Sequence, residues 1–305
     1  MHHHYNTIPA TPATALATNT AAVTVAITAA IKTIPVATAG SHLRHWLGKL
    51  SLGFAILVGS AAPALAAEPA SELRWGTDPG AAPFEFKDKD GKLSGFDIEL
   101  GNAICAQLKR KCVWVENDFD GLIPALKAKK FDIINASMSV TEKRLKEIDF
   151  SSRVTRAPSR MIAKDNAKLQ PTAAALRGKR VGVQQGSTHE AYAKQSWGKA
   201  GVEIVSYAKN DQIYADLQAG RLDAGLMDGV EAGLGFLKTP AGKGFGYAGA
   251  PVTDEKIFGL GTGFGVRKED AALKQSLNTA LAELKANGTY KKIMNKYFEF
   301  DVSGD

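Results

Sequence analysis

The sequence is poor in the residues that build metal centres and histidine-dependent active sites. Its 305 residues include two cysteines and six histidines, and five of these histidines lie within the first 45 positions. Beyond residue 66 the only histidine is His189. A zinc site made of cysteine and histidine therefore lacks ligands, and a Ser-His-Asp centre would depend on His189. We expect neither a metal ion nor a cofactor.

The sequence also lacks the basic, aromatic-rich patches that are typical of nucleic-acid-binding proteins. Its lysine and arginine clusters at 109–111 and 127–130 have no interleaved aromatic residues. The net charge of +7 includes three basic residues of the segment 1–66, which contains no acid, so the remainder carries +4. We interpret the clusters as solvated faces and expect no nucleic-acid partner.

Residues 1–66 have the features of a leader and signal peptide that is removed. Arg44 and Lys49 form a basic region, residues 50–58 form an apolar region, and Ala64-Leu65-Ala66 is an A-x-A cleavage site. The apolar run is too short to span a membrane comfortably. We therefore expect cleavage before Ala67 and export of residues 67–305.

The two cysteines, Cys105 and Cys112, lie seven residues apart. An exported protein reaches an oxidising compartment, so this pair predicts one local disulfide between a helix end and the next strand. Two free thiols are the alternative.

The exported part alternates between strand-like and helix-like segments, and its length suits two small cores. This alternation predicts parallel sheets covered by helices, with a break near 155–158. The expected strands are 73–77, 112–116, 131–137, 160–164, 180–184, 202–207, 223–227 and 261–268. The expected helices are 96–111, 119–130, 189–197, 210–220, 230–238, 269–288, which Gly288 ends, and 289–298.

Two Ser-x-x-Glu motifs follow apolar runs and predict capping boxes at helix starts. One pairs Ser139 with Glu142, and the other pairs Ser187 with Glu190. Helix starts favour anions because their N–H groups are free and the helix dipole is positive there. Arg144 could add a bidentate contact, so the sequence predicts a clamp for a small carboxylate. The alternative is that both motifs only cap helices.

The order of several motifs resembles the periplasmic polar-amino-acid-binding proteins of ABC importers, solute-binding protein family 3. The lysine/arginine/ornithine-binding and histidine-binding group is most similar, and the resemblance covers residues 70–305. It rests on LRWGTDPGAAPFEF, GKLSGFDIELGNAIC, NDFDGLIPALKAKKFD, SMSVTEKR, VGVQQGSTHEAYA, AGRLDAGLMD, GTGFGVRKED and ANGTYKKIMNKYF. The Cys105/Cys112 pair also matches a disulfide of that group.

This resemblance implies a two-lobed α/β fold, the periplasmic binding protein type II fold, which closes on its ligand about a two-strand hinge. Lobe 1 would comprise 67–155 and 262–305, and lobe 2 would comprise 159–252. The hinges would lie near 156–158 and 253–261.

The resemblance also implies a role for each matching residue. Arg144 would hold the ligand α-carboxylate with backbone N–H groups at Ser139 and Thr188, beside the Ser187 cap. Asp228 would hold the α-ammonium with Ser137 and Ser139. Asp78, with Asp97 near it, would meet a cationic side-chain end, and Phe119 would pack on the aliphatic stem.

The residues alone permit simpler roles. Asp78 could be a turn residue before Pro79-Gly80, Asp228 could cap the segment after it, and Phe119 could belong to the core. Opposite charges at both ends of a buried zwitterion are nonetheless a physical requirement, and Arg144 and Asp228 would provide them.

The sequence departs from the family pattern at three positions. Ala81 stands where an aromatic residue is usual, Gln184 where an apolar one is usual, and Met227 where a polar one is usual. The lost ring leaves room for a bulkier ligand, such as an opine-like conjugate. His189 follows Thr188 and is expected at the surface or rim of the pocket.

The resemblance implies a monomeric periplasmic receptor that captures arginine, lysine, ornithine or histidine for an inner-membrane ABC permease without turnover. A secreted dehydratase of the cyclohexadienyl type on the same fold is the enzymatic alternative, with Asp78 and His189 as candidate proton donors. A sensory or adhesive role for the same pocket is a third possibility.

Overall fold

The computed structural model describes residues 72–304, so the predicted leader and cleavage site lie outside the described residues. A first five-stranded sheet has the order β4-β1-β5-β12-β6. β1 pairs in parallel with β4 and β5, whereas β12 pairs antiparallel with β5 and β6. Its strands are β1 (Glu72–Thr77), β4 (Lys111–Glu116), β5 (Ile133–Ile134), β6 (Asp149–Phe150) and β12 (Gly265–Val266).

A second five-stranded sheet has the order β11-β7-β10-β8-β9 and is also mixed. β8 is parallel to β9 and β10, and β7 is antiparallel to β10 and β11. Its strands are β7 (Ser159–Lys164), β8 (Arg180–Gln184), β9 (Glu203–Tyr207), β10 (Ala224–Asp228) and β11 (Phe245–Tyr247). β2 (Phe86–Lys87) and β3 (Leu93–Ser94) form a separate hairpin.

Helices separate most of these strands along the chain, as the sequence predicts. The α-helices are α1 (Phe96–Gln107), α2 (Leu122–Lys127), α3 (Glu142–Leu145), α4 (Ala173–Leu176), α5 (Thr188–Ser196), α6 (Asn210–Gln218), α7 (Gly229–Glu231), α8 (Glu255–Phe258), α9 (Ala271–Ala286) and α10 (Thr289–Tyr297). Short 3₁₀ segments are η1 (Phe119–Gly121), η2 (Asp165–Ala167), η3 (Gly198–Ala200) and η5 (Pro240–Gly242), and η4 (Ala232–Leu237) is a π-helix. No helix within 72–304 is long and apolar enough to cross a membrane.

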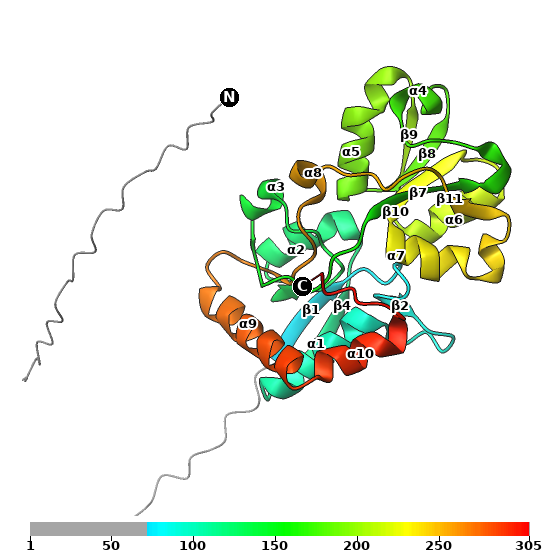
Figure 1. Ribbon diagram of the computed structural model, residues 1–305. Coiled ribbons are helices and arrows are strands. Elements are labelled where there is room, and N and C mark those ends of the chain that lie inside the picture. Colours follow the sequence, from blue (N-terminus) through cyan, green and yellow to red (C-terminus); the bar gives the residue numbers. More distant parts are fainter. Residues whose placement is uncertain (1–71, 305) are drawn as a thin grey trace, which may run out of the picture. The chain divides into compact units, whose positions relative to one another are not determined.

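Helices cover both faces of the first sheet because successive strand residues point to opposite sides. Leu73 and Trp75 are fully buried against α1, α9 and α10, which lie together beside β1 and β4 (Figure 1). Phe131 belongs to the cluster on the other face, with α2. A Cβ at Gly76 would lie 2.4 Å from the Phe131 ring, so this position requires glycine.

The second sheet shows the same alternation. Met161 and Ala163 of β7 pack in one apolar cluster with residues of α5, while Ile162 packs in another with residues of α6 and η4. The period of two along β7 thus places a helix layer on each face.

Two segments run side by side where the chain passes between the sheets. Val154 N–H donates to Thr262 O, and Thr262 N–H donates to Thr155 O, both at 2.8 Å. Farther along, Val252 N–H donates to Ser159 O at 2.9 Å. These paired segments overlap the predicted hinges, whose bounds, like those of the lobes, stay a prediction.

The predicted disulfide is present. Cys105 of α1 is bonded to Cys112 of β4, with their Cα atoms 5.7 Å apart. The bond ties a helix to the strand that follows it, and the indole N–H of Trp75 donates to Cys105 Sγ at 3.2 Å.

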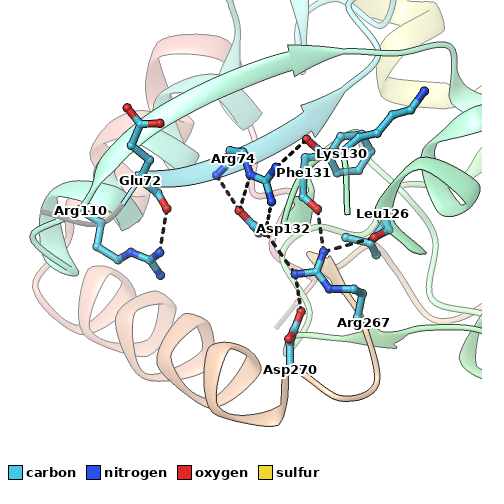
Figure 2. Close-up of polar contacts among 9 residues, drawn as sticks. All are labelled: Glu72, Arg74, Arg110, Leu126, Lys130, Phe131, Asp132, Arg267 and Asp270. Carbon is cyan, nitrogen blue, oxygen red and sulfur yellow. Dashed lines mark hydrogen bonds and ion pairs between the residues drawn. The ribbon is translucent and has the colours of Figure 1, made fainter. Parts of the chain in front are cut away.

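A polar network holds three strands of the first sheet together (Figure 2). Asp132, just before β5, accepts hydrogen bonds from Arg74 of β1 at 2.8 and 3.0 Å and from Arg267 at 3.1 Å. Arg267 follows β12 and also donates to the carbonyl of Phe131 at 2.7 Å. The network thus connects β1, which is followed by Asp78, to β5, which is followed by the segment that leads to Arg144.

Several predicted elements differ from the structure in extent or type. The strands expected at 131–137 and 261–268 are reduced to the two-residue β5 and β12. The helix expected at 230–238 is α7 continued by the π-helix η4. There, a Cβ at Gly235 would lie 2.4 Å from Ala82 O, so a neighbouring backbone approaches this helix closely.

Candidate functional site

A cavity of about 460 Å³ is lined by residues that follow strands of both sheets. This volume lies within the range of small-molecule sites. Every residue predicted to contact ligand lines it except Asp97: Asp78, Phe119, Ser137, Ser139, Arg144, Ser187, Thr188 and Asp228.

Arg144 is a buried cation in this cavity. Its side chain comes from α3, its residue is 8% exposed, and its guanidinium donates to Ser139 O at 2.9 Å and Gly186 O at 3.1 Å. The guanidinium carbon lies 5.4 Å from the centre of the Phe119 ring. No carboxylate within 72–304 forms an ion pair with Arg144, and burial lowers its pKa to about 10. The site thus holds a positive charge that only backbone carbonyls and an aromatic face stabilise.

The structure corrects the first predicted capping box. α3 begins at Glu142, and its N-cap is Thr141, whose hydroxyl accepts the Arg144 N–H at 3.2 Å. Ser139 instead forms an isolated antiparallel bridge with Thr262. The Ser-x-x-Glu spacing was misleading because a better-placed threonine follows Ser139.

The second box is present with one altered bond. Ser187 caps α5 and accepts the Glu190 N–H at 3.1 Å. The Glu190 carboxylate reaches back to the N–H of Gly186 at 2.8 Å, one residue before the cap. Of the two predicted helix starts, only that of α5 is therefore capped by the predicted serine.

Asp78 is buried and fully engaged by the protein's own side chains. Its residue is 2% exposed, Lys209 Nζ lies 3.1 Å from Oδ1, and Gln184 donates to Oδ2 at 2.7 Å. Burial raises the pKa of Asp78, and the Lys209 charge opposes that rise. The simpler turn role also holds, because Gly80 N–H donates to Asp78 O at 2.8 Å. Lys209 was not predicted from the sequence as part of the site.

Asp97 organises the cavity wall without lining it. Its Oδ2 accepts the Ser137 N–H at 2.9 Å and the Ser137 hydroxyl at 3.2 Å. Ser137 has a φ of 45°, a conformation that these bonds help to hold. The hydroxyl also lies 3.3 Å from Glu85, a buried acid that the sequence analysis missed. Burial raises the pKa of Asp97 to about 6 and, with the nearby Asp97, raises that of Glu85 well above its usual value.

Asp228 caps a helix, as the simpler sequence interpretation allowed. It ends β10, and its Oδ1 accepts the N–H groups of Val230 at 2.8 Å and Glu231 at 3.0 Å. Burial raises the pKa of Asp228 to about 6. Capping and ligand binding are compatible, since a carboxylate can accept several hydrogen bonds.

Glu231 is a second buried acid that the sequence analysis missed. Asn210 Nδ2 lies 2.8 and 3.0 Å from its carboxylate oxygens, and the Tyr214 hydroxyl lies 3.2 Å away. Burial, and then the Asp228 charge, raises the pKa of Glu231 to about 8. This side of the cavity therefore carries an excess of acidic groups.

His189 lines the cavity and is partly buried. Its Nε2 lies 3.0 Å from the Ser159 hydroxyl, and its ring centre lies 5.5 Å from that of Phe258. Burial, and then the Arg144 charge, lowers the pKa of His189 to about 3. The imidazole is therefore neutral near pH 7 and can accept or donate a hydrogen bond.

The three departures from the family pattern differ in position. Ala81 and Gln184 line the cavity. Met227, 1% exposed, packs in the apolar cluster with Ile162 and Ile213 and is not part of the cavity lining.

Comparisons with known proteins agree on one group. Residues 73–300 match the family model described as bacterial extracellular solute-binding proteins, family 3. The lysine/arginine/ornithine-binding periplasmic protein of Escherichia coli is 53% identical over 84% of this chain and 99% of the relative. The histidine-binding periplasmic protein of Salmonella typhimurium is 51% identical over 84% of this chain and 98% of the relative. The solved structure of an ancestral arginine-binding protein bound to arginine matches with a TM-score of 0.70 and 38% identity, covering 75% of this chain and 98% of that one.

Proposed function

Because the chain belongs to family 3 of the bacterial extracellular solute-binding proteins, we propose that it captures a cationic L-amino acid for an ABC importer. The candidate ligands are arginine, lysine, ornithine and histidine. The names of relatives that are about half identical to this chain support this set.

The buried, unpaired guanidinium of Arg144 is the observation that carries the proposal. Charges removed from water are stable only when opposite charge and hydrogen bonds replace the solvent. Arg144 has two carbonyl acceptors and no acid among the described residues. A ligand carboxylate would complete its coordination, with the Thr188 N–H at the start of α5 as a second donor.

Acids on the other side of the cavity would hold the α-ammonium group. We assign Asp228 to this contact, with the hydroxyls of Ser137 and Ser139 as neutral acceptors. Asp97 would act through Ser137, whose backbone and hydroxyl it holds. Phe119 would pack on the ligand stem, and Asp78 would meet the cationic end.

Capture and release would follow from closure of two lobes about the paired segments near 154–159 and 252–262. Polar contacts already link groups of the two sheets, including Arg144 to Gly186 and Gln184 to Asp78. Ligand would favour the closed state because it adds contacts to both sides. The partner would be an inner-membrane permease, and the receptor would act in the periplasm as a monomer.

A dehydratase is the second candidate, and it is motivated by one structural neighbour that is itself an amino-acid-binding protein but is described as the precursor of such an enzyme. An ancestral amino-acid-binding protein described as a precursor of cyclohexadienyl dehydratase matches with a TM-score of 0.66 and 34% identity, over 75% of this chain and 96% of that one. Glu231, whose pKa is raised to about 8, would be protonated near pH 7 and would serve as the proton donor. Incubation with prephenate or arogenate separates the two functions, and we expect no product.

A ligand screen tests the proposal directly. Thermal-shift assays with the twenty amino acids, ornithine, citrulline and opines should show the largest stabilisation with one of the four cationic candidates. Calorimetry should then give one site per chain. Stabilisation by none of the four would refute the proposal, and a response to opines alone would indicate a larger ligand that uses the space beside Ala81.

A further inference from the structure

Lys209 forms an ion pair with Asp78, the carboxylate that is proposed to bind the cationic end of the ligand. Its Nζ lies 3.1 Å from Asp78 Oδ1, while Gln184 binds Oδ2. The Asp78 side chain is 3% exposed. Asp78 lines the cavity, so a ligand cation that binds it must share its charge with Lys209 or displace Lys209.

The local helix does not explain a lysine at this position. Lys209 is the N-cap of α6, where serine, threonine, aspartate and asparagine are favoured and the helix dipole repels a cation. Its backbone N–H is bound by Gln212 Oε1 at 3.2 Å, without any use of the ammonium group. The partner of the ammonium group is Asp78, which is 131 residues away in sequence and follows β1 of the other sheet.

A second acid lies within reach of the same ammonium group. Asp118 Oδ1 is 3.8 Å from Lys209 Nζ, and the Asp118 side chain is 59% exposed. Lys209 itself is 31% exposed. The ammonium group thus lies between a buried carboxylate and a solvated one, and a small movement would exchange the first for the second.

The lysine stem runs past small residues. A Cβ at Gly80 would lie 3.6 Å from Lys209 Cβ and 3.8 Å from its Cγ and Cδ. Ala81 follows Gly80 and lines the cavity. Small side chains here leave room for the stem to change position.

We propose that Lys209 is a specificity-determining residue that competes with the ligand's cationic end for Asp78. It lowers the preference of the pocket for a cationic side chain over a neutral one of the same shape. With a neutral ligand, Lys209 stays on Asp78; with a cationic ligand, it moves to Asp118. This inference rests on the proposed function, because it assumes that the side-chain end lies at Asp78.

Arginine and citrulline distinguish this role from a purely structural one. They have nearly the same shape, but the citrulline ureido group is neutral. If Lys209 only tied the two sides of the cavity together, its removal would weaken both ligands alike. If Lys209 competes for Asp78, its removal should increase the affinity for arginine. It should decrease the affinity for citrulline, because bound citrulline would leave Asp78 buried without a cation.

The test measures both dissociation constants by calorimetry, with competition for the weaker ligand. In Lys209→Met we expect the arginine-to-citrulline affinity ratio to rise at least tenfold, about 1.4 kcal/mol. Asp118→Asn removes the second partner and should lower the ratio. Lys199→Met, an exposed lysine of η3 outside the cavity lining, is the matched control and should leave the ratio unchanged.

Each outcome decides the question. An unchanged ratio in folded Lys209→Met overturns the inference while arginine binding by the wild type leaves the proposed function standing. A wild type that binds arginine but no citrulline at millimolar concentration also overturns it. A wild type that binds none of the cationic amino acids refutes both proposals. If Lys209→Met does not fold, Lys209→Gln replaces it.

Discussion

Replacement of Arg144 by methionine should abolish tight amino-acid binding while leaving the protein folded. Methionine keeps an unbranched stem against Phe119 but removes the charge. Among the described residues that line the cavity, Arg144 is the only buried cation, and it has no acidic partner. Its loss would remove the proposed contact with the α-carboxylate, which all amino-acid ligands share, so the binding of every ligand should weaken.

The magnitude follows from burial. Truncating one partner of a buried, hydrogen-bonded charge pair costs about 2–5 kcal/mol. That range corresponds to a loss of roughly 30-fold to several-thousand-fold in affinity. The buried position of Arg144 places the expectation in the upper half of the range, because little solvent screens the contact.

Stability should change far less than affinity. Burial lowers the Arg144 pKa from 12.5 to about 10; the guanidinium stays charged near pH 7, but its charged form is destabilised by roughly 3–4 kcal/mol, at about 1.4 kcal/mol for each pKa unit. Two hydrogen bonds from a charged donor offset this cost, at about 1.5–3 kcal/mol each. Methionine removes the cost and the bonds together, so we expect a net change within about 2 kcal/mol.

Calorimetric titration and thermal unfolding of the same samples test both halves of this reasoning. Arg177→Met is the matched control, since Arg177 is exposed and outside the cavity lining. The control should keep the wild-type affinity. A folded Arg144→Met variant with near-normal affinity would show that the ligand carboxylate lies elsewhere and would refute the clamp.

Three further predictions concern the acids and the disulfide. Asp78→Asn should lower the affinity for arginine or lysine at least tenfold more than the affinity for citrulline (about 1.4 kcal/mol). Equal losses of affinity in calorimetry would show that Asp78 does not bind the cationic end of the ligand. The pKa of Glu231 is raised from 4.5 to about 8, so the native state retains a proton that the unfolded chain loses, and wild-type stability should decline as pH rises from about 4.5 to 8. Glutamine does not titrate, so the stability of Glu231→Gln should not decline in this way, and its melting temperature relative to wild type should rise between pH 5 and pH 8. A melting-temperature difference that is independent of pH would contradict the raised pKa of Glu231. Loss of the Cys105–Cys112 bond, with its separation of seven residues, should cost about 2–3 kcal/mol of stability without changing affinity, because neither cysteine lines the cavity. Equal affinity and a lower melting temperature of the double serine variant would confirm this, whereas a loss of binding would link the disulfide to the site.

Local sequence signals predicted the long elements of the fold well. β8 matches its predicted range of 180–184, and α5 and α6 begin within one residue of expectation. Gly288, with a φ of 79°, separates α9 from α10 as predicted. These elements have clear ends, such as the Ser187 cap of α5 and Gly288 after α9. β5 and β12 were predicted too long because apolar runs continue beyond the short stretches where strands pair.

The candidate site was predictable only where a residue's own neighbourhood carries the signal. Arg144, Asp228 and Ser187 belong to motifs, and all three line the cavity. Lys209 pairs with a residue 131 positions away, and Glu231 is bound by Asn210 and Tyr214 of α6. Such contacts depend on tertiary packing. One available signal for Lys209 was a lysine at a helix N-cap, where local physics disfavours it.

The charges of the cavity divide recognition into a common part and a selective part. Arg144 has no acidic partner among the described residues, so a ligand carboxylate gains its full attraction without displacing any protein group. Asp78 has a cationic partner, so a ligand cation gains only the difference between its own attraction and that of Lys209. In the proposed binding mode, the zwitterion shared by all amino acids would therefore be bound strongly, and the side chain would be discriminated weakly. A pocket arranged in this way would accept several basic amino acids with similar affinity, and changes at Lys209 would alter that selection without affecting the clamp.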